Sequence, residues 1–374
     1  MKNIQFFDYP ALYTRFEKEF DAIFKDVCSR GAFILQKDLG AFEAALAEFV
    51  GTRHALGVAD GTNALIIGLK ALDIGPGDEV IISPHTYVAT AASIHLVGAT
   101  PVFADIGEDN LLSAAAAERK ITSRTRAIMP TQVNGRCADM DAIGEIAKRH
   151  GLITLEDSAQ GLGAKFKGKC AGTFGPFGTL SFYPAKLIGC FGDGGAVMTD
   201  DDEMAEKLSL WRDHGRDKSG RVVAWGTNAR LDNLQAAFLH LRLMHFDEDI
   251  ARRREIARKY HEGLSDLPEL RLPPPPVDGG DHFDVYQNYE LAAEDRDRLK
   301  AYLAERGVRT IVQWAGTPVH HFSELGFGKD RFDDLPRTDW FFERCLMLPM
   351  HMALSDEDVD YVIEQVRGFY KESR

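Results

Sequence analysis

The sequence predicts an α/β protein whose mostly parallel sheet is wrapped by helices. Two observations indicate this class. Short apolar runs alternate with helical patterns between residues 54 and 156. The 374 residues, 45% of them hydrophobic, suffice for one large core and a smaller second domain. We therefore expect a three-layer α/β/α large domain over residues 1–245 and a smaller α+β domain over residues 246–374.

The large domain is expected to begin with helices. Residues 1–35 predict an N-terminal helix followed by a loop, and Asp38–Phe49 has apolar residues at helical spacing behind an aspartate that can cap it. Strands and helices then alternate. The expected strands are His54–Ala59, Glu79–Ser83, Pro101–Ala104, Arg126–Pro130 and Leu152–Glu156. The expected helices between them are Asn63–Leu72, Ala89–Leu96 and Asp139–His150.

The second half of the chain is more helical. Residues 200–245 have a helical pattern that is interrupted around Gly215–Asn228, and a long charged helix follows at Glu248–Leu264. Pro273–Pro276 and then Gly279-Gly280 break the pattern before the smaller domain. The elements expected there are strands Val285–Leu291 and Arg309–Gln313 and helices Asp295–Glu305 and Asp356–Tyr370.

Composition excludes several classes of function. The formal charge of −13 argues against a broad surface for nucleic acid or membrane. No run approaches the roughly 18 apolar residues that cross a bilayer, and the first residues do not resemble a signal sequence. The five cysteines are scattered without paired spacing, so neither zinc nor a disulfide framework is expected. We expect a cytoplasmic protein without a metal site.

Polar or glycine-containing segments follow four of the apolar runs. Because ligands bind at the carboxyl ends of the strands in such sheets, these segments are expected to face one side together. This convergence is stronger evidence than any single motif. The four segments are Asp60–Thr62, His85–Tyr87, Asp157-Ser158 and Lys186.

Lys186 is the most informative of these residues. An apolar strand ends at Ser181, the lysine follows within a turn, and Gly192–Gly195 lets the backbone fold back. A lysine between buried strands suits covalent chemistry, and we interpret Lys186 as the residue that forms a Schiff base with pyridoxal 5′-phosphate (PLP). A surface lysine beside a glycine turn is the alternative. A nucleotide loop lacks support, because the chain has neither a GxGxxG after its first strand nor a Walker pattern.

Three further positions admit a functional and a purely structural interpretation. The amides of Gly61 and Thr62 open a helix and can bind phosphate, or they form an ordinary cap. The ring of Tyr87 can stack on a flat cofactor, or it packs in the core.

Two neighbouring acids end the strand near residue 156. A carboxylate beneath a pyridine nitrogen keeps that nitrogen protonated, but Asp157 can equally cap a helix. Because side chains alternate on a strand, only one of Glu156 and Asp157 is expected to face a ligand. Gln160 can hold the 3-oxygen of the ring or cap a turn.

Together these segments resemble one family. Ser181–Lys186 with Gly192–Gly195 is similar to the lysine motif of the DegT/DnrJ/EryC1/StrS sugar aminotransferases, and the likeness covers nearly the whole chain in the expected order. Departures at Gln132 and Asn134, where many members have histidine and an aromatic residue, are expected around the sugar pocket. The other matching segments are Asp60–Leu65, Thr86–Thr90, Glu156–Gln160 and Asn228–Ala237.

The resemblance implies a fold-type I PLP enzyme that forms a homodimer with shared active sites. Lys186 would bind the cofactor, Asp157 would pair with its pyridinium, Tyr87 would stack on the ring and Gln160 would lie near the 3-oxygen. The groups implied for the phosphate are the amides of Gly61 and Thr62, Ser181, and Asn228 from the partner subunit. Arg230 would reach the substrate from that subunit.

The implied reaction moves an amino group from L-glutamate to a keto group of a nucleotide-linked sugar, for amino-sugar and surface-polysaccharide biosynthesis. The pattern favours a 3-keto UDP-sugar acceptor, although members that aminate C4 of 6-deoxy sugars share much of it. Gln313, Trp314 and His320 occupy the region where members contact the sugar, and Trp314 can instead fill the domain interface. A different PLP enzyme, such as a lyase or desulfurase, and a PLP-loaded sensor are the alternatives.

Overall fold

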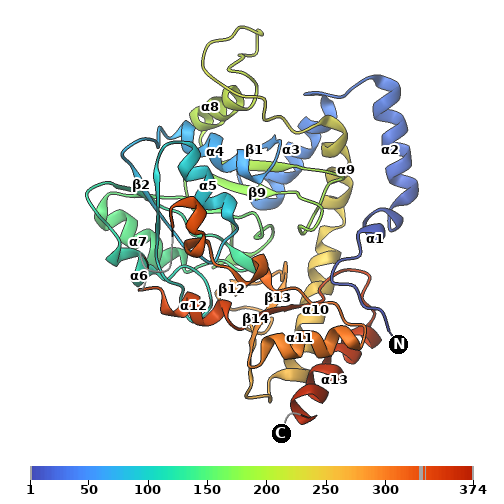
Figure 1. The fold of residues 1–374 in the computed structure, drawn as a ribbon. Coiled ribbons are helices and arrows are strands. Elements are labelled where there is room, and N and C mark those ends of the chain that lie inside the picture. The colour runs from blue at the N-terminus through green and yellow to red at the C-terminus, as the bar shows by residue number, and fades with distance from the viewer. Residues whose placement is uncertain (1, 328–331, 333, 373–374) are drawn as a thin grey trace.

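The computed structural model describes residues 2–327, 332 and 334–372. Its centre is a sheet in the order β3-β2-β4-β5 and β6-β9-β10-β1, in which the two halves are joined where β5 runs into β6 and Thr131 pairs with Asp157 (Figure 1). The strands of this sheet are β1 His54–Val58, β2 Glu79–Ile82, β3 Thr100–Phe103, β4 Thr125–Ile128, β5 Ile153–Thr154, β6 Glu156–Asp157, β9 Gly178–Ser181 and β10 Gly195–Thr199.

Most pairs of neighbouring strands are parallel, as the sequence predicts. β2 is parallel to β3 and β4, β4 to β5, and β6 to β9, whereas β10 is antiparallel to both β9 and β1. Ser181 at the end of β9 pairs with Gly195 at the start of β10. The loop of residues 182–194, which carries Lys186, therefore leaves and returns at the same edge of the sheet.

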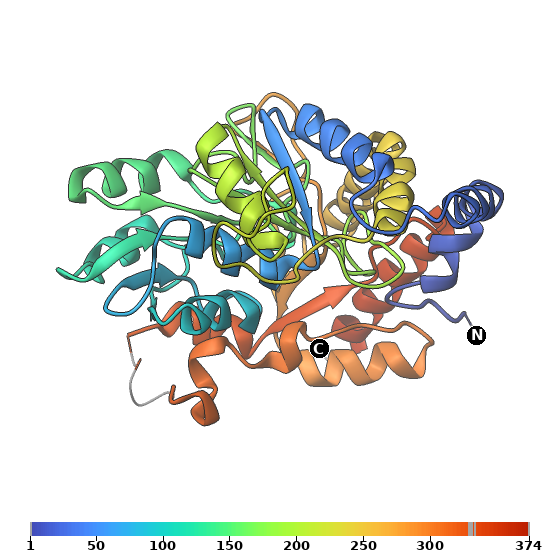
Figure 2. The ribbon, with the colours of Figure 1, turned by 90° about the horizontal axis from the view of Figure 1, so that it is seen from above.

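Helices cover both faces of the sheet (Figure 2). Side chains on β2 show how the faces divide, because Ile81 joins the core under α3, α7 and α9 while Val80 and Ile82 join the core under α4, α5 and α8. The predicted three layers are thus confirmed. The helices around the sheet are α3 Lys37–Val50, α4 Gly61–Ala71, α5 Val88–Leu96, α6 Ala114–Arg119, α7 Met140–His150, α8 Asp202–Arg212 and α9 Asn233–Met244.

The N-terminal region contains two helices where the sequence predicts one. These are α1, Tyr9–Thr14, and α2, Glu17–Arg30, which stands at the margin of the molecule beside α9 (Figure 1). The buried ring of Phe20 on α2 packs edge-on against Phe238 of α9 at 5.4 Å between centroids. This contact attaches the peripheral helix α2 to α9 of the large domain.

A second core lies at the C-terminal end of the chain. It is built on α10, and Ile4 from the N-terminus packs into it. The division at residues 245 and 246 remains our proposal. The helices of this part are α10 Phe246–Leu264, α11 Arg296–Glu305, α12 Pro336–Phe342 and α13 Asp356–Glu372, and its antiparallel sheet runs β11 Leu270–Arg271, β13 Tyr289–Ala293 and β14 Cys345–Leu348.

Smaller elements complete the described chain. A short three-stranded sheet joins β12 His282–Phe283, β7 Lys165–Phe166 and β8 Lys169–Cys170. The 3-10 helices are η1 Val133–Gly135, η2 Gln313–Gly316, η3 Val319–His321 and η4 Ser323–Leu325. No helix in these described ranges is long and apolar enough to cross a lipid bilayer.

Two strand predictions in the smaller domain are wrong. Arg309–Gln313 forms only isolated bridges, because the chain turns through left-handed conformations at Trp314 and Ala315 directly afterwards. The strand predicted at Val285–Leu291 begins only at Tyr289, since Tyr286 has a φ of 51° that an extended strand does not allow. β13 pairs with β11 on one side and with β14 on the other, and the sequence pattern indicates neither of these partners.

Candidate active site

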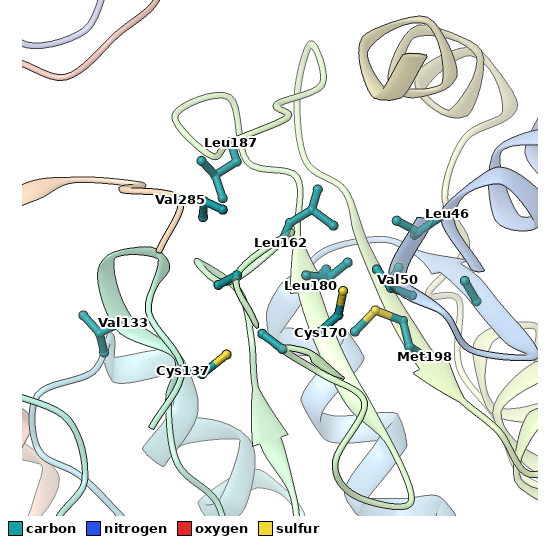
Figure 3. Packing of buried hydrophobic residues seen from close by; sticks show 14 of the residues in the cluster. Leu46, Val50, Val133, Cys137, Leu162, Cys170, Leu180, Leu187, Met198 and Val285 are labelled. Atoms are coloured by element: carbon teal, nitrogen blue, oxygen red, sulfur yellow. The ribbon is translucent and has the colours of Figure 1, made fainter. Parts of the chain in front are cut away.

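The loop of Lys186 is held in place by contacts on both sides. Leu187 is buried and lies beside Val285 above the core of the large domain (Figure 3). The side-chain amide of Gln287 donates to the Ala185 carbonyl at 2.8 Å. A Cβ at Gly189 would lie 2.3 Å from the Pro184 carbonyl oxygen, so this tight turn requires glycine. The lysine thus projects from a fixed loop.

The environment of Lys186 shifts its amine toward the neutral form. Burial lowers the pKa of Lys186 from its ordinary value to about 8, and the negative charge of Asp157 opposes this shift in part. A neutral amine is the nucleophilic form of lysine, and the interaction with Asp157 brings together two residues that lie 29 positions apart in the sequence.

Asp157 is buried at the end of β6 and accepts two hydrogen bonds. The Thr90 hydroxyl donates to its Oδ2 at 2.6 Å, and the Ala159 amide donates to its Oδ1 at 3.1 Å. Glu156 points to the opposite side, where it accepts from the amides of Gly172 and Phe174. The expected divergence of the two acids is confirmed.

The N-terminus of α4 forms a cradle beside β9. The Asp60 side chain caps the helix by accepting from the Asn63 amide at 2.8 Å. A Cβ at Gly61 would lie 3.0 Å from Ser181 Cβ, so the helix end and the serine are as close as glycine permits. Within the described chain, the amides of Gly61 and Thr62 have no hydrogen-bond partner. Free amides, a helix dipole and a hydroxyl together suit a phosphate.

The aromatic and amide candidates lie on neighbouring segments. Tyr87 caps α5 and is 57% exposed, and its ring centroid lies 6.5 Å from that of Trp314. The side-chain oxygen of Gln160 accepts from the Asn134 amide at 2.8 Å. The structure therefore places Tyr87 near Trp314 and Gln160 beside the loop of η1.

A buried polar network extends from Asn134 into the smaller domain. Its centre is Glu290 on β13, which accepts from the Asn134 side chain at 2.6 Å and contacts His85 Nε2 at 3.2 Å. With its amide nitrogen turned toward Glu290, Gln313 donates to both carboxylate oxygens at 2.8 and 2.9 Å. The side chain of Asn288 donates to Asn134 Oδ1 at 2.9 Å. Gln313 is thus buried in this network.

Two positions expected around the sugar pocket have other contacts. Gln132 is fully buried and donates to Glu156 at 2.8 Å, while its oxygen accepts from the Ala138 amide. Its position is a correction to the expectation, because a side chain in the core does not face a sugar. Asn134 belongs to the network around Glu290.

Asn228 and Arg230 lie at the base of a projecting loop. Asn228 is exposed and pairs with Asp213, and the Arg230 guanidinium donates to Asp213 at 2.9 Å. The loop of residues 214–227, which ends at Asn228, extends beyond α8 (Figure 1), and its Trp225 is 89% exposed. These contacts tie both candidates to the loop and to the end of β1.

His320 lies apart from these groups. It is completely buried, its ring packs 6.3 Å from that of Phe103, and its Nε2 lies 3.1 Å from Asp339 Oδ1. Burial lowers the pKa of His320 to about 4, so the ring is neutral. Its role as a substrate contact stays a prediction.

Sequence reasoning missed several residues of the site. Thr90 donates directly to Asp157, and Thr131 is linked to Thr90 through Thr86. Glu290 accepts from Asn134, whose backbone amide donates to Gln160. A threonine on a helix and a glutamate on a strand carry no local signal. Thr90 was visible only as the last residue of a motif resembling the family.

The described residues fit PLP. A reactive amine, an acid for the ring nitrogen and a phosphate cradle lie at one edge of the sheet, and the Gly61–Ser181 contact leaves no room for a side chain there. The residues that would hold the cofactor are Lys186, Asp157, Tyr87, Gln160, Gly61, Thr62 and Ser181.

Comparisons with known proteins find similar enzymes and a similar solved structure. It is 40% identical to the dTDP-3-amino-3,4,6-trideoxy-alpha-D-glucose transaminase of Streptomyces venezuelae, covering 97% of this chain and 95% of the relative. It is 36% identical to the UDP-2-acetamido-2-deoxy-3-oxo-D-glucuronate aminotransferase of Pseudomonas aeruginosa, covering 96% and 98%. The crystal structure of S. venezuelae DesV in complex with a ketimine intermediate superposes with a TM-score of 0.94 at 40% identity, covering 99% of each chain.

These findings establish the class of the enzyme. Similar solved aminotransferases hold the cofactor in its PLP and PMP forms, so this chain is a PLP-dependent sugar aminotransferase of the fold that the sequence predicts. The family model matches residues 14–367. The chain belongs to the DegT/DnrJ/EryC1/StrS aminotransferase family.

Proposed function

We propose that this enzyme transfers the amino group of L-glutamate to the C3 keto group of a UDP-linked sugar. The observation that carries the transfer chemistry is Lys186, an amine of lowered pKa that interacts with Asp157 beside the phosphate cradle. When bound, PLP supplies an electron sink for the carbanion that forms at the α-carbon of the donor.

The residues have distinct roles in this proposal. Lys186 would hold the cofactor through its Nζ, and as a free amine the same Nζ would accept the proton of the donor α-carbon and later return a proton. An amine whose pKa is about 8 keeps a minor neutral fraction near physiological pH, far larger than that of an ordinary lysine, and this fraction can accept that proton. Asp157 holds the proton on the ring nitrogen, and Ser181 with the amides of Gly61 and Thr62 binds the phosphate.

Names of the relatives support amination at C3. The S. venezuelae transaminase is named for a 3-amino dTDP-sugar, and the P. aeruginosa enzyme is named for a 3-oxo UDP-sugar. Trp314, whose ring centroid lies 6.5 Å from that of Tyr87, supplies a flat surface where a sugar can lie beside the cofactor. The two names agree on position C3 and differ in the nucleotide and in the rest of the sugar.

A second subunit belongs to the proposal. Asn228 and Arg230 are tied to the projecting loop, whose Trp225, Val222 and Val223 are strongly exposed. Large exposed apolar side chains are typical of an interface. In a homodimer this loop would carry Asn228 to the phosphate of the partner's cofactor and Arg230 to its substrate.

The acceptor is tested by running the reaction backward. Purified enzyme is given 2-oxoglutarate and a panel of UDP-linked and dTDP-linked 3-amino sugars and dTDP-linked and GDP-linked 4-amino-6-deoxy sugars, and glutamate is measured. We expect the fastest release with a UDP-linked 3-amino sugar and none with Lys186→Ala. Faster release with a 4-amino sugar or with a dTDP-linked sugar would contradict the proposed acceptor.

A further inference from the structure

Asp157 stands at the end of a chain of three buried hydroxyl groups. The Thr90 hydroxyl lies 2.6 Å from Asp157 Oδ2, the Thr86 hydroxyl lies 2.6 Å from that of Thr90, and the Thr131 hydroxyl lies 2.9 Å from that of Thr86. All four side chains are buried. The chain connects the segments that follow β4 and β2 with α5 and β6, at the edge of the sheet that carries Lys186.

The direction of this hydrogen-bond chain follows from the number of protons. Each hydroxyl has a single proton to donate. If Asp157 is ionised, Thr90 must donate to it, so Thr86 must donate to Thr90 and Thr131 to Thr86, which agrees with the geometry at Thr131. Hydrogen bonds in series polarise one another, so the donor that reaches Asp157 is strengthened by the other two.

We propose that Thr131, Thr86 and Thr90 form a positioning relay that keeps Asp157 ionised and oriented, and thereby keeps the proton on the ring nitrogen of PLP. Hydrogen bonds donated to a carboxylate favour its charged form. Asp157 then competes weakly for the proton that it shares with the ring, and the ring stays a strong electron sink. The three threonines act through Asp157 and do not touch the cofactor. This inference rests on the proposed role of Asp157.

The relay is tested at Thr90, because valine has the same shape and lacks the hydroxyl. Enzyme loaded with PLP that carries ¹⁵N in its ring is studied by NMR, which reports whether the ring nitrogen holds a proton. In Thr90→Val we expect the signal to move toward the unprotonated ring, since an unassisted carboxylate takes the proton back. The single-turnover rate with glutamate should fall roughly ten- to a hundredfold, the range for a lost hydrogen bond to a charged group.

Further variants separate the relay from a structural effect. Thr90→Ser keeps the donor and should restore both the ring signal and the rate, whereas Thr86→Val should give a smaller change, because Thr90 can still donate. Thr173→Val is the matched control, since this buried hydroxyl donates to the Cys170 carbonyl. All variants are compared at equal cofactor content and after thermal unfolding has shown that they fold.

Two outcomes would overturn the relay: a ring signal in Thr90→Val that matches wild type, or Thr90→Ser behaving like Thr90→Val. The ring signal is recorded without any sugar. An unchanged signal therefore overturns the relay alone, whereas the acceptor proposal is decided separately by glutamate release from amino-sugar nucleotides.

Discussion

At the scale of single residues, the site depends on two opposed influences on Lys186. Burial lowers the pKa of its amine, and the charge of Asp157 raises it. The result, about 8, places the change from cation to neutral amine near the working pH of most enzymes. The carboxylate that we propose for the ring nitrogen thus also raises the pKa of the lysine.

This balance predicts the pH dependence of cofactor capture. In protein freed of PLP, the rate of covalent PLP uptake should rise as the pH is raised and reach half its maximum near pH 8, because only the neutral Lys186 amine reacts. Stopped-flow absorbance measures it. Asp157→Asn removes the charge that raises the pKa, so its midpoint should lie lower. A wild-type midpoint near that of free lysine would contradict this account.

At the scale of elements, the loop of Lys186 is supported from outside the sheet. The loop continues to Phe191, whose backbone amide and carbonyl are bound by the side chain of Gln235 on α9. The Phe191 ring packs edge-on against Phe20 of α2 at 5.0 Å between centroids. A peripheral helix therefore reaches the segment that carries the lysine.

Phe20 is expected to determine how firmly α2 is held. Truncation in Phe20→Ala removes a buried ring and should lower the free energy of unfolding by about 3–5 kcal/mol, with hydrogen exchange in α2 rising most. Urea unfolding and exchange mass spectrometry measure these effects. Phe24→Ala on the same helix is the control, because Phe24 is 52% exposed and should change stability little. Equal losses in the two variants would show that α2 is not anchored through Phe20.

At the scale of the whole molecule, one chain supplies most but not all of the proposed site. Lys186, Asp157 and the phosphate cradle meet at one edge of the large sheet. Glu290, from the C-terminal part of the chain, reaches Asn134 beside Gln160. Asn228 belongs to a loop that projects away from the body of the protein (Figure 1). An active site shared between two subunits accounts for this arrangement.

Mixed dimers test whether the site is shared. Lys186→Ala and Asn228→Ala subunits should each have little activity, but mixing them should restore about a quarter of the wild-type activity, because half of the dimers then contain one complete site. The control mixes Lys186→Ala subunits with Asp157→Asn subunits. Because one subunit supplies both residues to the same site, no mixed dimer has a complete site and no activity should return. Absence of recovery in the first mixture, with subunit exchange verified by mass spectrometry, would show that Asn228 serves its own chain.

Much of this protein was determined by local sequence. Alternating apolar runs predicted the parallel sheet and its helical layers, and the motifs at strand ends predicted which face carries the chemistry, because parallel strands end at a common edge. Each motif could be recognised from the residues of its own strand or turn, without knowledge of distant contacts. The lysine loop, the cap at Asp60 and the divergence of Glu156 and Asp157 were therefore predictable.

Only the tertiary structure decided the contacts between distant segments. The threonines that reach Asp157 come from α5 and from the segments after β2 and β4. Glu290 meets Asn134 across 156 positions of sequence. The predictions of short strands in the smaller domain were wrong for the same reason. β14 is a strand because it pairs with β13, which is distant in the sequence. Local propensity fixes which edge of a sheet is reactive, whereas the packing of separate elements determines the hydrogen bonds that tune its groups.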